Sequence, residues 1–391
     1  MSGLPERHRR IRLGMIGGGA GAFIGGVHRI AARLDDHFEL VAGALSAEAE
    51  RARTSALELG IAPERAYGDF AEMLRSEAAR PDAIEVVAIV TPNHRHYAPA
   101  KASIEAGFHV ICDKPLTATL DEAEQLGDVV RQSGRIFGLT HNYTGYPLVR
   151  QAREMVAAGE LGAIRTVQVE YAQDWLTTPL EATGQKQASW RTDPGRSGPG
   201  GCIGDIGTHA YNLARFVTGL PCLGVAADIS SFVAGRRVDD NAQVLLRFDK
   251  GARGMLWASQ VAPGNENALR LRVYGETAGL DWRQEQPNNL WLTPLAEPPR
   301  LIRRGGAGTG AAASRATRVP GGHPEGYLEA FAQLYADLAE QIRARREGRA
   351  PDPAALLVPG VAEGLEGMRF IAAVLESSRR NSAWVSIPPS V

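Results

Sequence analysis

Two side chains suited to proton transfer, Asp205 and His209, lie four positions apart in the second half of the 391-residue chain. A glycine-rich approach over residues 198–204 precedes them, and an apolar helical pattern follows over residues 205–217. If a helix begins here, both side chains lie on one of its faces. A carboxylate can fix the tautomer of an imidazole, whose pKa lies close to working pH, so the pair suits acid-base catalysis. The same residues would equally serve as a helix cap and a buried histidine.

A glycine loop near the N-terminus has the pattern of a dinucleotide site. Residues 11–16 form an apolar run that predicts a buried strand, and Gly17, Gly19 and Ala22 then fit G-x-G-x-x-G/A before a helical pattern. Glycine lets a pyrophosphate approach the backbone amides at the helix N-terminus. The residues expected to bind the cofactor in this loop are Gly17, Gly19, Gly21, Ala22, Phe23 and Ile24.

The second expected strand, over residues 38–45, ends without the acidic residue that often binds the adenosine ribose. Ser46 stands at this position and would tolerate a ribose 2′-phosphate, and Arg51 follows close by, together with Glu48 and Glu50. We therefore expect the cofactor to be NAD or NADP, with NAD slightly favoured.

Polar residues follow three further expected strands, over residues 84–90, 108–112 and 135–140. In an open α/β sheet, ligands bind at the carboxyl ends of the strands. A lysine placed at such an end, before a proline, faces the crevice rather than the solvent. The residues at this edge that we expect to bind the cofactor are Thr91, Pro92, Asn93, His96, Asp113, Lys114 and Asn142, and Tyr143 beside them is expected to bind the substrate.

The alternation of strands with helices predicts a doubly wound parallel sheet as far as residue 143. Helical patterns cover residues 47–59, 69–79 and 120–133. We therefore divide the chain into a flexible tail at 1–10, a Rossmann dinucleotide-binding domain at 11–143, and a substrate-binding and oligomerisation domain at 144–391.

The second domain reads as α+β, built on a large, mostly antiparallel open sheet. A helix over 148–158 leads to strands expected over residues 164–173, 223–233, 242–248, 253–260 and 269–274. Residues 303–322 are expected to be a long mobile loop, and helices over 328–346 and 361–377 and a short strand over 383–387 complete the chain. The open sheet face could supply a dimer or tetramer interface.

Composition excludes several classes of protein. The net charge of −1 gives no electrostatic reason to bind nucleic acid or an anionic membrane, and no apolar stretch is long enough to span a bilayer. Three dispersed cysteines form no CxxC motif or Cys/His cluster, so we expect neither disulfides nor a metal site, and the cytoplasm fits. Arg9-Arg10 superficially resembles a twin-arginine export signal, but the apolar run behind it is better used as a strand and glycine loop.

In combination, these motifs resemble the glucose-fructose oxidoreductase, inositol dehydrogenase and rhizopine catabolism family, Gfo/Idh/MocA, from Ile11 onward. The resemblance rests on the order and spacing of the glycine loop with His28, Thr91-Pro92-Asn93 with His96, Asp113-Lys114-Pro115, and Gly204-Asp205-Ile206-Gly207-Thr208-His209. In the third of these motifs, Asp113 stands in place of the commoner glutamate. The chain departs from the family in two ways: the glycine loop is longer than usual before His28, and Ser46 leaves the choice between NAD and NADP open.

The resemblance implies a role for each matched residue. Lys114 resembles the family lysine that hydrogen-bonds the reacting hydroxyl, and His209 resembles the proton acceptor. Asp205 resembles the carboxylate that binds the substrate or orients His209. The turn from Thr91 to His96 resembles the one that contacts the nicotinamide half, and the family implies a homodimer or homotetramer.

We therefore expect an NAD(P)-dependent oxidoreductase acting on a ring secondary alcohol of a sugar, glycoside or cyclitol such as inositol. Oxidation of such an alcohol needs a base and a positive charge near the oxygen, and no metal. Aromatic side chains could stack on a sugar, and polar ones could bind its hydroxyls. The expected substrate-binding residues are Lys114, Tyr143, Trp175, Trp190, Arg191, Asp205, His209 and His323.

Two other functions fit the same motifs. One is redox-neutral, NAD-dependent glycoside cleavage, which would release free sugar without net NADH. The other is a non-catalytic NADP-binding sensor, which would have no need of Lys114, Asp205 and His209. His323 also has a second interpretation, as a polar residue before the helix at 328–346.

Overall fold

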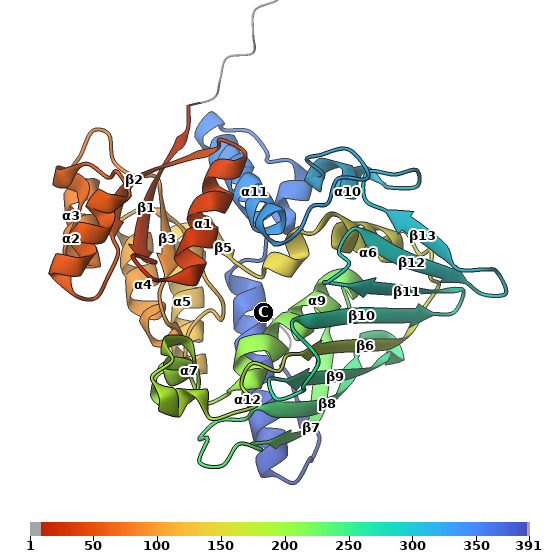
Figure 1. Ribbon diagram of the computed structural model, residues 1–391. Helices are drawn as coiled ribbons and strands as arrows, with labels where there is room; N and C mark the ends of the chain where they lie inside the picture. Colours follow the sequence, from red (N-terminus) through yellow and green to blue (C-terminus); the bar gives the residue numbers. More distant parts are fainter. Residues whose placement is uncertain (1–8, 389–391) are drawn as a thin grey trace, which may run out of the picture.

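The computed structural model describes residues 9–388, which form two sheets of five and nine strands (Figure 1). Residues 1–8, most of the expected N-terminal tail, lie outside the described residues. Among the helices of residues 9–388, none is long and apolar enough to cross a membrane. The predicted fold class, a parallel sheet followed by a larger and mostly antiparallel one, is confirmed.

The five-stranded sheet has the order β2-β1-β3-β4-β5, and all its neighbouring strands are parallel. Every residue of β3 is buried, as in a strand covered on both faces. Its strands are β1 Ile11–Gly17, β2 Phe38–Ala44, β3 Val86–Val90, β4 His109–Cys112 and β5 Phe137–Leu139. The helices between them are α1 Phe23–Leu34, α2 Ala49–Glu58, α3 Phe70–Ala78, α4 Tyr97–Glu105 and α5 Leu120–Ser133.

The nine-stranded sheet has the order β13-β12-β11-β10-β6-β9-β8-β7-β14, in which only β6 and β9 are parallel neighbours. Its strands are β6 Ile164–Ala172, β7 Cys222–Ser230, β8 Asn241–Phe248, β9 Arg253–Ser259, β10 Ala268–Gly275, β11 Ala278–Arg283, β12 Asn289–Pro294, β13 Arg300–Arg303 and β14 Val385–Ser386. Helices cover one face of this sheet, among them α6 Pro147–Ala157, α9 Thr208–Thr218 and α12 Val361–Arg379 (Figure 1).

Two expectations for the chain after residue 275 need correction. Strands β11 to β13 were not predicted, because each strand has few apolar positions and turns separate one strand from the next. The segment 303–322 is not loop throughout, since it contains helix α10, Ala311–Ala316. This segment is also anchored, because Arg304 donates a hydrogen bond from Nη1 to Glu325 Oε1 at 2.8 Å and both side chains are almost fully buried.

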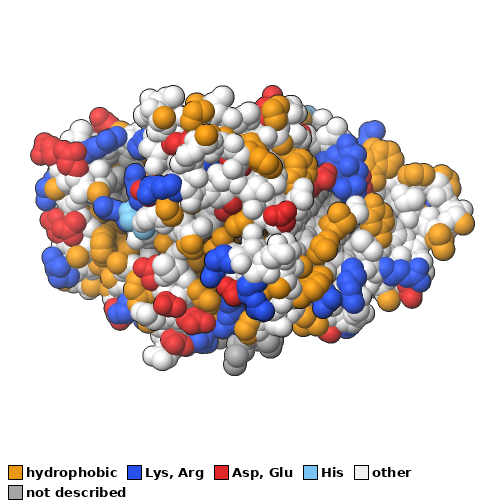
Figure 2. Space-filling view, turned by 90° about the horizontal axis from the view of Figure 1, so that it is seen from below, with side chains coloured by type: hydrophobic (Ala, Val, Ile, Leu, Met, Phe, Trp, Pro, Cys, Tyr) orange, Lys and Arg blue, Asp and Glu red, His pale blue; other side chains and the backbone are white. Residues whose placement is uncertain are grey.

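The other face of the nine-stranded sheet is open, and its side chains alternate between apolar and polar. Leu245 and Met255 are about half exposed there, while Glu170 and Arg272 form an ion pair on β6 and β10. Seen from below, the molecule as a whole carries both signs of charge interspersed with apolar side chains (Figure 2). The expected oligomer interface on the sheet stays a prediction.

The C-terminal part of the chain returns to the nucleotide domain. Helix α11, Tyr327–Glu347, packs on α1, and its Phe331, Tyr335 and Leu338 share a core cluster with residues of β1. Tyr335 Oη also lies 2.8 Å from Nδ1 of the buried His28. The covering layer of the first sheet is therefore completed by residues far along the sequence.

A buried ion pair joins α11 to α6. Arg150 Nη2 donates to Asp337 Oδ2 at 2.5 Å, and both side chains are at most 1% exposed. Since Asp337→Ala leaves the guanidinium buried without its partner, we expect the free energy of unfolding to fall by about 3 to 5 kcal/mol. Urea denaturation measures this. Asp128→Ala, in the exposed pair with Arg131, is the control and should change stability by less than about 1 kcal/mol. Equal losses in both variants would contradict the prediction.

Candidate active site

Two cavities meet at the carboxyl edge of the five-stranded sheet. The first, of about 840 Å³, lies among the glycine loop, the end of β2, the turn after β3 and helix α7 Lys186–Arg191. The second, of about 560 Å³, lies between the end of β6, helix α9 and the strand ends beside them. Lys114, Arg191 and Asp205 line both cavities. A ligand that extends through the first cavity would therefore end at these three side chains.

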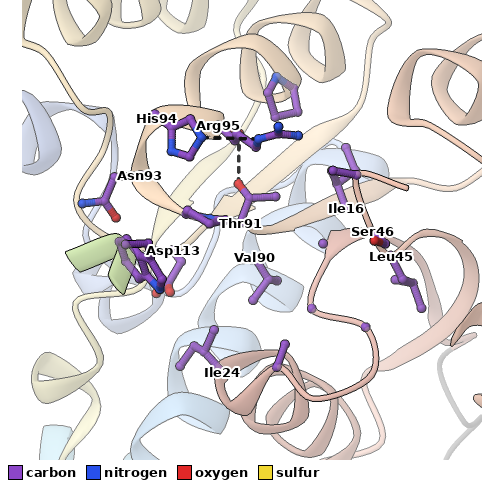
Figure 3. Close-up of a pocket in the computed structure, with 18 of the residues that line it drawn as sticks. Ile16, Ile24, Leu45, Ser46, Val90, Thr91, Asn93, His94, Arg95 and Asp113 are labelled. Atoms are coloured by element: carbon purple, nitrogen blue, oxygen red, sulfur yellow. Dashed lines mark hydrogen bonds between the residues drawn. The ribbon is translucent and has the colours of Figure 1, made fainter. Parts of the chain in front are cut away.

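The glycine loop offers a backbone surface to the first cavity. Gly17 has φ of +78°, and a Cβ at Gly19 would lie 2.6 Å from the carbonyl oxygen of Leu45. A Cβ at Gly25 would lie 2.2 Å from the oxygen of Gly18, so α1 packs directly on the loop. This backbone cradle before a helix N-terminus fits a dinucleotide pyrophosphate. Figure 3 shows Ile16, Ile24, Leu45 and Val90 around it.

The end of β2 places Ser46 and Arg51 in the first cavity, as expected. Arg51 Nη2 donates to the oxygen of Ala20 at 3.0 Å, so α2 is tied to the glycine loop. Asp69 and Phe70, at the start of α3, line the same cavity, and neither was predicted as a site residue. Asp69 caps α3 by accepting from Glu72 N at 2.8 Å, which is a local pattern that could have drawn attention to it.

The turn after β3 divides into residues that face the cavity and one that supports them. Thr91, Pro92 and Asn93 line the first cavity, as do His94 and Arg95, which were not predicted (Figure 3). His96 does not line it. Its ring nitrogens lie 2.7 Å from the oxygen of Pro115 and 2.8 Å from that of Thr91, so it joins two strand ends from within the core.

The carboxylate of Asp205 collects the polar groups at the junction of the cavities. Lys114 Nζ donates to its backbone oxygen at 2.5 Å and to Oδ1 at 2.8 Å. Arg191 Nε and Gln260 Nε2 donate to Oδ2 at 3.2 and 2.9 Å. Burial alone would raise the pKa of Asp205, but the charges of Lys114 and Arg191 outweigh it and hold that pKa well below its usual value. The carboxylate is therefore ionised.

Asp205 and His209 do not pair as the helical spacing predicted. Asp205 lies in a π-helical turn, Ile203–Gly207, and α9 begins only after it. Both side chains still line the second cavity, but they form no hydrogen bond with each other. The oxygens of Asp205 bind Lys114, Arg191 and Gln260, whereas Nδ1 of His209 is buried without a hydrogen-bond partner among the described residues.

His209 lies among aromatic rings. Its ring centroid is 4.9 Å from that of Tyr143, 5.3 Å from that of His141 and 6.3 Å from that of Tyr171. Burial, and then the charge of Lys114, lower the pKa of His209 well below the ordinary value for histidine. The same two causes lower the pKa of His141 to about 3. Both imidazoles are therefore neutral near pH 7, and His209 lines the second cavity in a form that can accept a proton.

Uncharged hydrogen-bonding groups line much of the second cavity. Tyr143 Oη lies 2.5 Å from Tyr171 Oη, which donates to Asn267 Oδ1 at 2.7 Å. Gln173 donates from Nε2 to the same oxygen at 2.8 Å, and its Oε1 accepts from Trp175 Nε1 at 3.0 Å. Several of these residues were not predicted, because isolated amides carry no sequence motif. The residues lining this cavity that were not predicted are Thr140, Gln173, Gln185, Gln187, Ile206, Asn267, Gln284, Tyr327 and Phe331.

The remaining predicted residues fall in different places. Trp190 lines the first cavity and not the second, with its ring 4.3 Å from the Arg191 guanidinium. Asn142, expected beside the cofactor, lines the second cavity, and its buried Nδ2 has no partner among the described residues. Gly21 and His323 line neither cavity, and His323 is exposed. Within residues 9–388, no group of three or more His, Cys, Asp or Glu side chains could hold a metal ion.

Comparisons with known proteins follow the same division of the chain. A family model described as an oxidoreductase family with an NAD-binding Rossmann fold matches residues 11–141. A second model, the GFO/IDH/MocA C-terminal domain, matches residues 149–281. The crystal structure of an oxidoreductase from Sinorhizobium meliloti is 55% identical, with a TM-score of 0.88, and the match covers 96% of this chain and 99% of that one.

Two further relatives have more informative names. An inositol dehydrogenase homolog from Azotobacter vinelandii, in complex with NADH and myo-inositol, is 37% identical with a TM-score of 0.89, over 97% of this chain and 98% of that one. Levoglucosan dehydrogenase from Pseudarthrobacter phenanthrenivorans is 28% identical over an alignment of 413 positions, which covers 97% of this chain and 99% of that protein. Both likenesses extend over nearly the full length of the chains.

Phe23 is 71% exposed although it lines both cavities, so a bound ligand would cover its ring. Partial burial of a phenylalanine is worth roughly 1 to 2 kcal/mol. We therefore expect Phe23→Ala to raise the Kd for NAD about 5- to 30-fold, measured by isothermal titration calorimetry. Leu295→Ala removes a side chain that is 75% exposed and lines neither cavity, and it should leave the Kd unchanged. An unchanged Kd in Phe23→Ala would contradict a contact with the cofactor.

Proposed function

Because the chain belongs to the Gfo/Idh/MocA oxidoreductase family, whose N-terminal domain is an NAD-binding Rossmann domain, we propose that it oxidises a ring secondary alcohol of a sugar or cyclitol. The observation that carries this proposal is the junction of the two cavities, where Lys114 and Asp205 face both. NAD bound in the first cavity would supply the hydride acceptor. The chain's own residues must then bind the alcohol and accept its proton.

Lys114 is the group that we assign to the alcohol oxygen. An ammonium has three N–H donors, of which Asp205 accepts two, so one is left for the substrate. Its positive charge would stabilise the negative charge that develops on the oxygen as the proton leaves. Asp205 holds this ammonium in place while Arg191 and Gln260 hold Asp205. The arrangement is fixed before any substrate binds, which is the condition for electrostatic catalysis.

His209 is the residue that we assign to the proton. Because its pKa is lowered, the imidazole is neutral and has a free lone pair on one ring nitrogen. The nearby positive charge of Lys114 would lower the pKa of the bound alcohol. The neutral imidazole can then accept the proton without first losing one of its own. Asp205 contributes through Lys114 in this scheme and does not bind His209 directly.

The lining of the second cavity supports a neutral polyhydroxylated substrate. Its amides and phenols can donate and accept hydrogen bonds, and its cations, Lys114 and Arg191, are both paired with Asp205. Trp175 adds an aromatic ring on which the apolar face of a sugar ring could pack. Relatives named as an inositol dehydrogenase homolog and levoglucosan dehydrogenase agree with this class of substrate.

The direct test is the reduction of NAD or NADP by purified protein with a panel of inositols, free sugars, anhydrosugars and glucosides. We expect absorbance at the NADH wavelength to rise with at least one neutral cyclitol or sugar, and faster with NAD. Products are analysed in parallel, because the release of free sugar without net NADH would assign glycoside cleavage instead. No turnover of any kind by protein that binds NAD would overturn the proposal.

Lys114→Ala removes the proposed ligand of the alcohol oxygen. We expect kcat/KM to fall by at least about 100-fold, the usual cost of losing one preorganised donor, while NAD affinity stays largely intact. Steady-state kinetics and calorimetric titration with NAD measure the two effects. Lys101→Ala, which removes an exposed lysine paired with Glu105, is the control and should change neither. An equal loss of NAD binding in Lys114→Ala would make Lys114 mainly a cofactor anchor.

The lowered pKa of His209 predicts the pH dependence of oxidation. A base whose pKa is lowered stays unprotonated to a lower pH, so kcat/KM should not halve near the ordinary histidine pKa of about 6.5. We expect the acid-side loss at a clearly lower pH. Initial rates across the pH range, with circular dichroism at each pH to verify folding, measure this. A loss centred near pH 6.5 would count against His209 as the base.

A further inference from the structure

The loop over residues 231–240, between β7 and β8, lines neither cavity but contains three buried charged side chains. Arg236 is 8% exposed, Asp239 is 7% exposed and Asp240 is fully buried. Burying a charge is costly unless it is paired and hydrogen-bonded. The partners of these side chains therefore show what the loop stabilises.

Asp239 binds the start of the helix that carries Asp205 and His209. Its Oδ1 accepts from Gly201 N at 2.6 Å, its backbone oxygen from Cys202 N at 2.9 Å, and its Oδ2 from Ile203 N at 2.8 Å. The first N–H groups of a helix have no partner within it, and a negative charge there also complements the helix dipole. Asp239 thus caps the start of this helical segment, although it lies more than thirty residues away in the sequence.

The fit between the two segments is close. A Cβ at Gly201 would lie 2.0 Å from the backbone oxygen of Asp239, so any side chain at that position would force the segments apart. Cys202 Sγ adds a contact of 3.0 Å to Asp239 Oδ2. The place of the π-helical turn therefore depends on the position of Asp239.

Arg236 binds a second segment of the site. Its Nε and Nη2 donate to the two carboxylate oxygens of Glu181 at 2.9 and 3.0 Å. Nη1 donates to the oxygen of Leu176 at 2.9 Å and to Asp240 Oδ2 at 3.1 Å, and Nη2 donates to the oxygen of Thr178 at 3.2 Å. These contacts cover residues 176–181, which directly follow Trp175 and lead into α7 with Arg191.

We propose that the loop 231–240 is a positioning element of the active site, in which Asp239 sets the place of Asp205 and His209, and Arg236 sets the place of the segment that bears Trp175. Neither residue lines a cavity, so both act through the residues that they hold. The kinetic consequences rest on the proposed dehydrogenase function, whereas the positioning itself does not.

Hydrogen exchange of the unliganded protein tests the role of Asp239. Asp239→Asn keeps the shape of the side chain, but its amide has one acceptor oxygen for two backbone donors and turns an NH₂ group toward the other. We expect faster exchange at residues 201–209, with β3 unchanged as an internal reference. Asp352→Asn is the matched control, because Asp352 also caps a turn, accepting from Ala354 N at 2.9 Å, and lines neither cavity. Unchanged exchange at 201–209 would overturn the proposal.

Glu181→Gln tests the other contact from the opposite side and leaves the buried Arg236–Asp240 pair intact. We expect faster exchange at residues 176–191. Glu276→Gln is the control. Glu276 lies in the turn between β10 and β11 and forms an exposed ion pair with Arg165, so its substitution should leave the exchange of residues 176–191 unchanged. If Asp239→Asn does not fold, Asp239→Glu replaces it, because the added methylene moves the carboxylate while keeping its charge. Slower or unchanged exchange at residues 201–209 in the first variant, or at residues 176–191 in the second, would contradict the positioning role of the loop.

Kinetics then separate positioning from general destabilisation. Small displacements of catalytic groups are costly, so Asp239→Asn should lower kcat by about 10- to 100-fold with KM changed less than about threefold. Glu181→Gln should raise KM by about 3- to 10-fold while kcat stays within about twofold. The same pattern of loss in both variants would overturn the division of roles. If the wild-type protein oxidises no alcohol, the proposed function fails, and the exchange data alone decide the positioning role.

Discussion

The Asp205 carboxylate accepts hydrogen bonds from Lys114, which follows a strand of the nucleotide domain, and from Arg191 and Gln260 of the second domain. One largely buried anion, whose side chain is 19% exposed, thus joins two cations and an amide where the cavities meet. Removing it would leave both cations without this partner, which is costly for charges that are largely shielded from water. This interaction fixes the ammonium at the junction of the two cavities and links the two domains at that point.

The parts that hold this carboxylate come from separate regions of the chain. The helix that bears it is capped by Asp239, and the end of β9 leads directly to Gln260. Helix α11 then returns from the C-terminal region to cover the nucleotide domain and is tied to α6 by the Arg150–Asp337 pair. The geometry of the site is therefore a property of both domains packed together, and neither domain contains it alone.

Charge is distributed unevenly between the two sides of the junction. The nucleotide cavity combines exposed backbone with Arg51, Arg95 and other cationic side chains, which suits a phosphate-bearing cofactor. The second cavity shares Lys114, Arg191, Asp113 and Asp205 with the first, and most of its other polar lining consists of amides, phenols and the neutral imidazole of His209. Burial and the charge of Lys114 keep His209 neutral, so an ammonium and a proton acceptor can coexist in one small space. Neutral hydroxyl groups match that lining better than charged groups do.

The sequence by itself determined the fold class, the glycine loop and the place of Lys114 at the carboxyl edge of the sheet, because strands that end at one sheet edge bring local motifs together. Asp205 was expected at the site from the resemblance of its motif to the family. The bounds of α5, Leu120–Ser133, also followed from local periodicity. Only the tertiary structure decided that Asp205 binds Lys114 and not His209, since the π-helical turn has no clear sequence pattern. The tertiary structure alone also brought Asn267 and Gln173 to the second cavity and Asp239 to the start of the helix. A polar side chain looks the same in the sequence whether it is solvated or buried, and only packing supplies its partners.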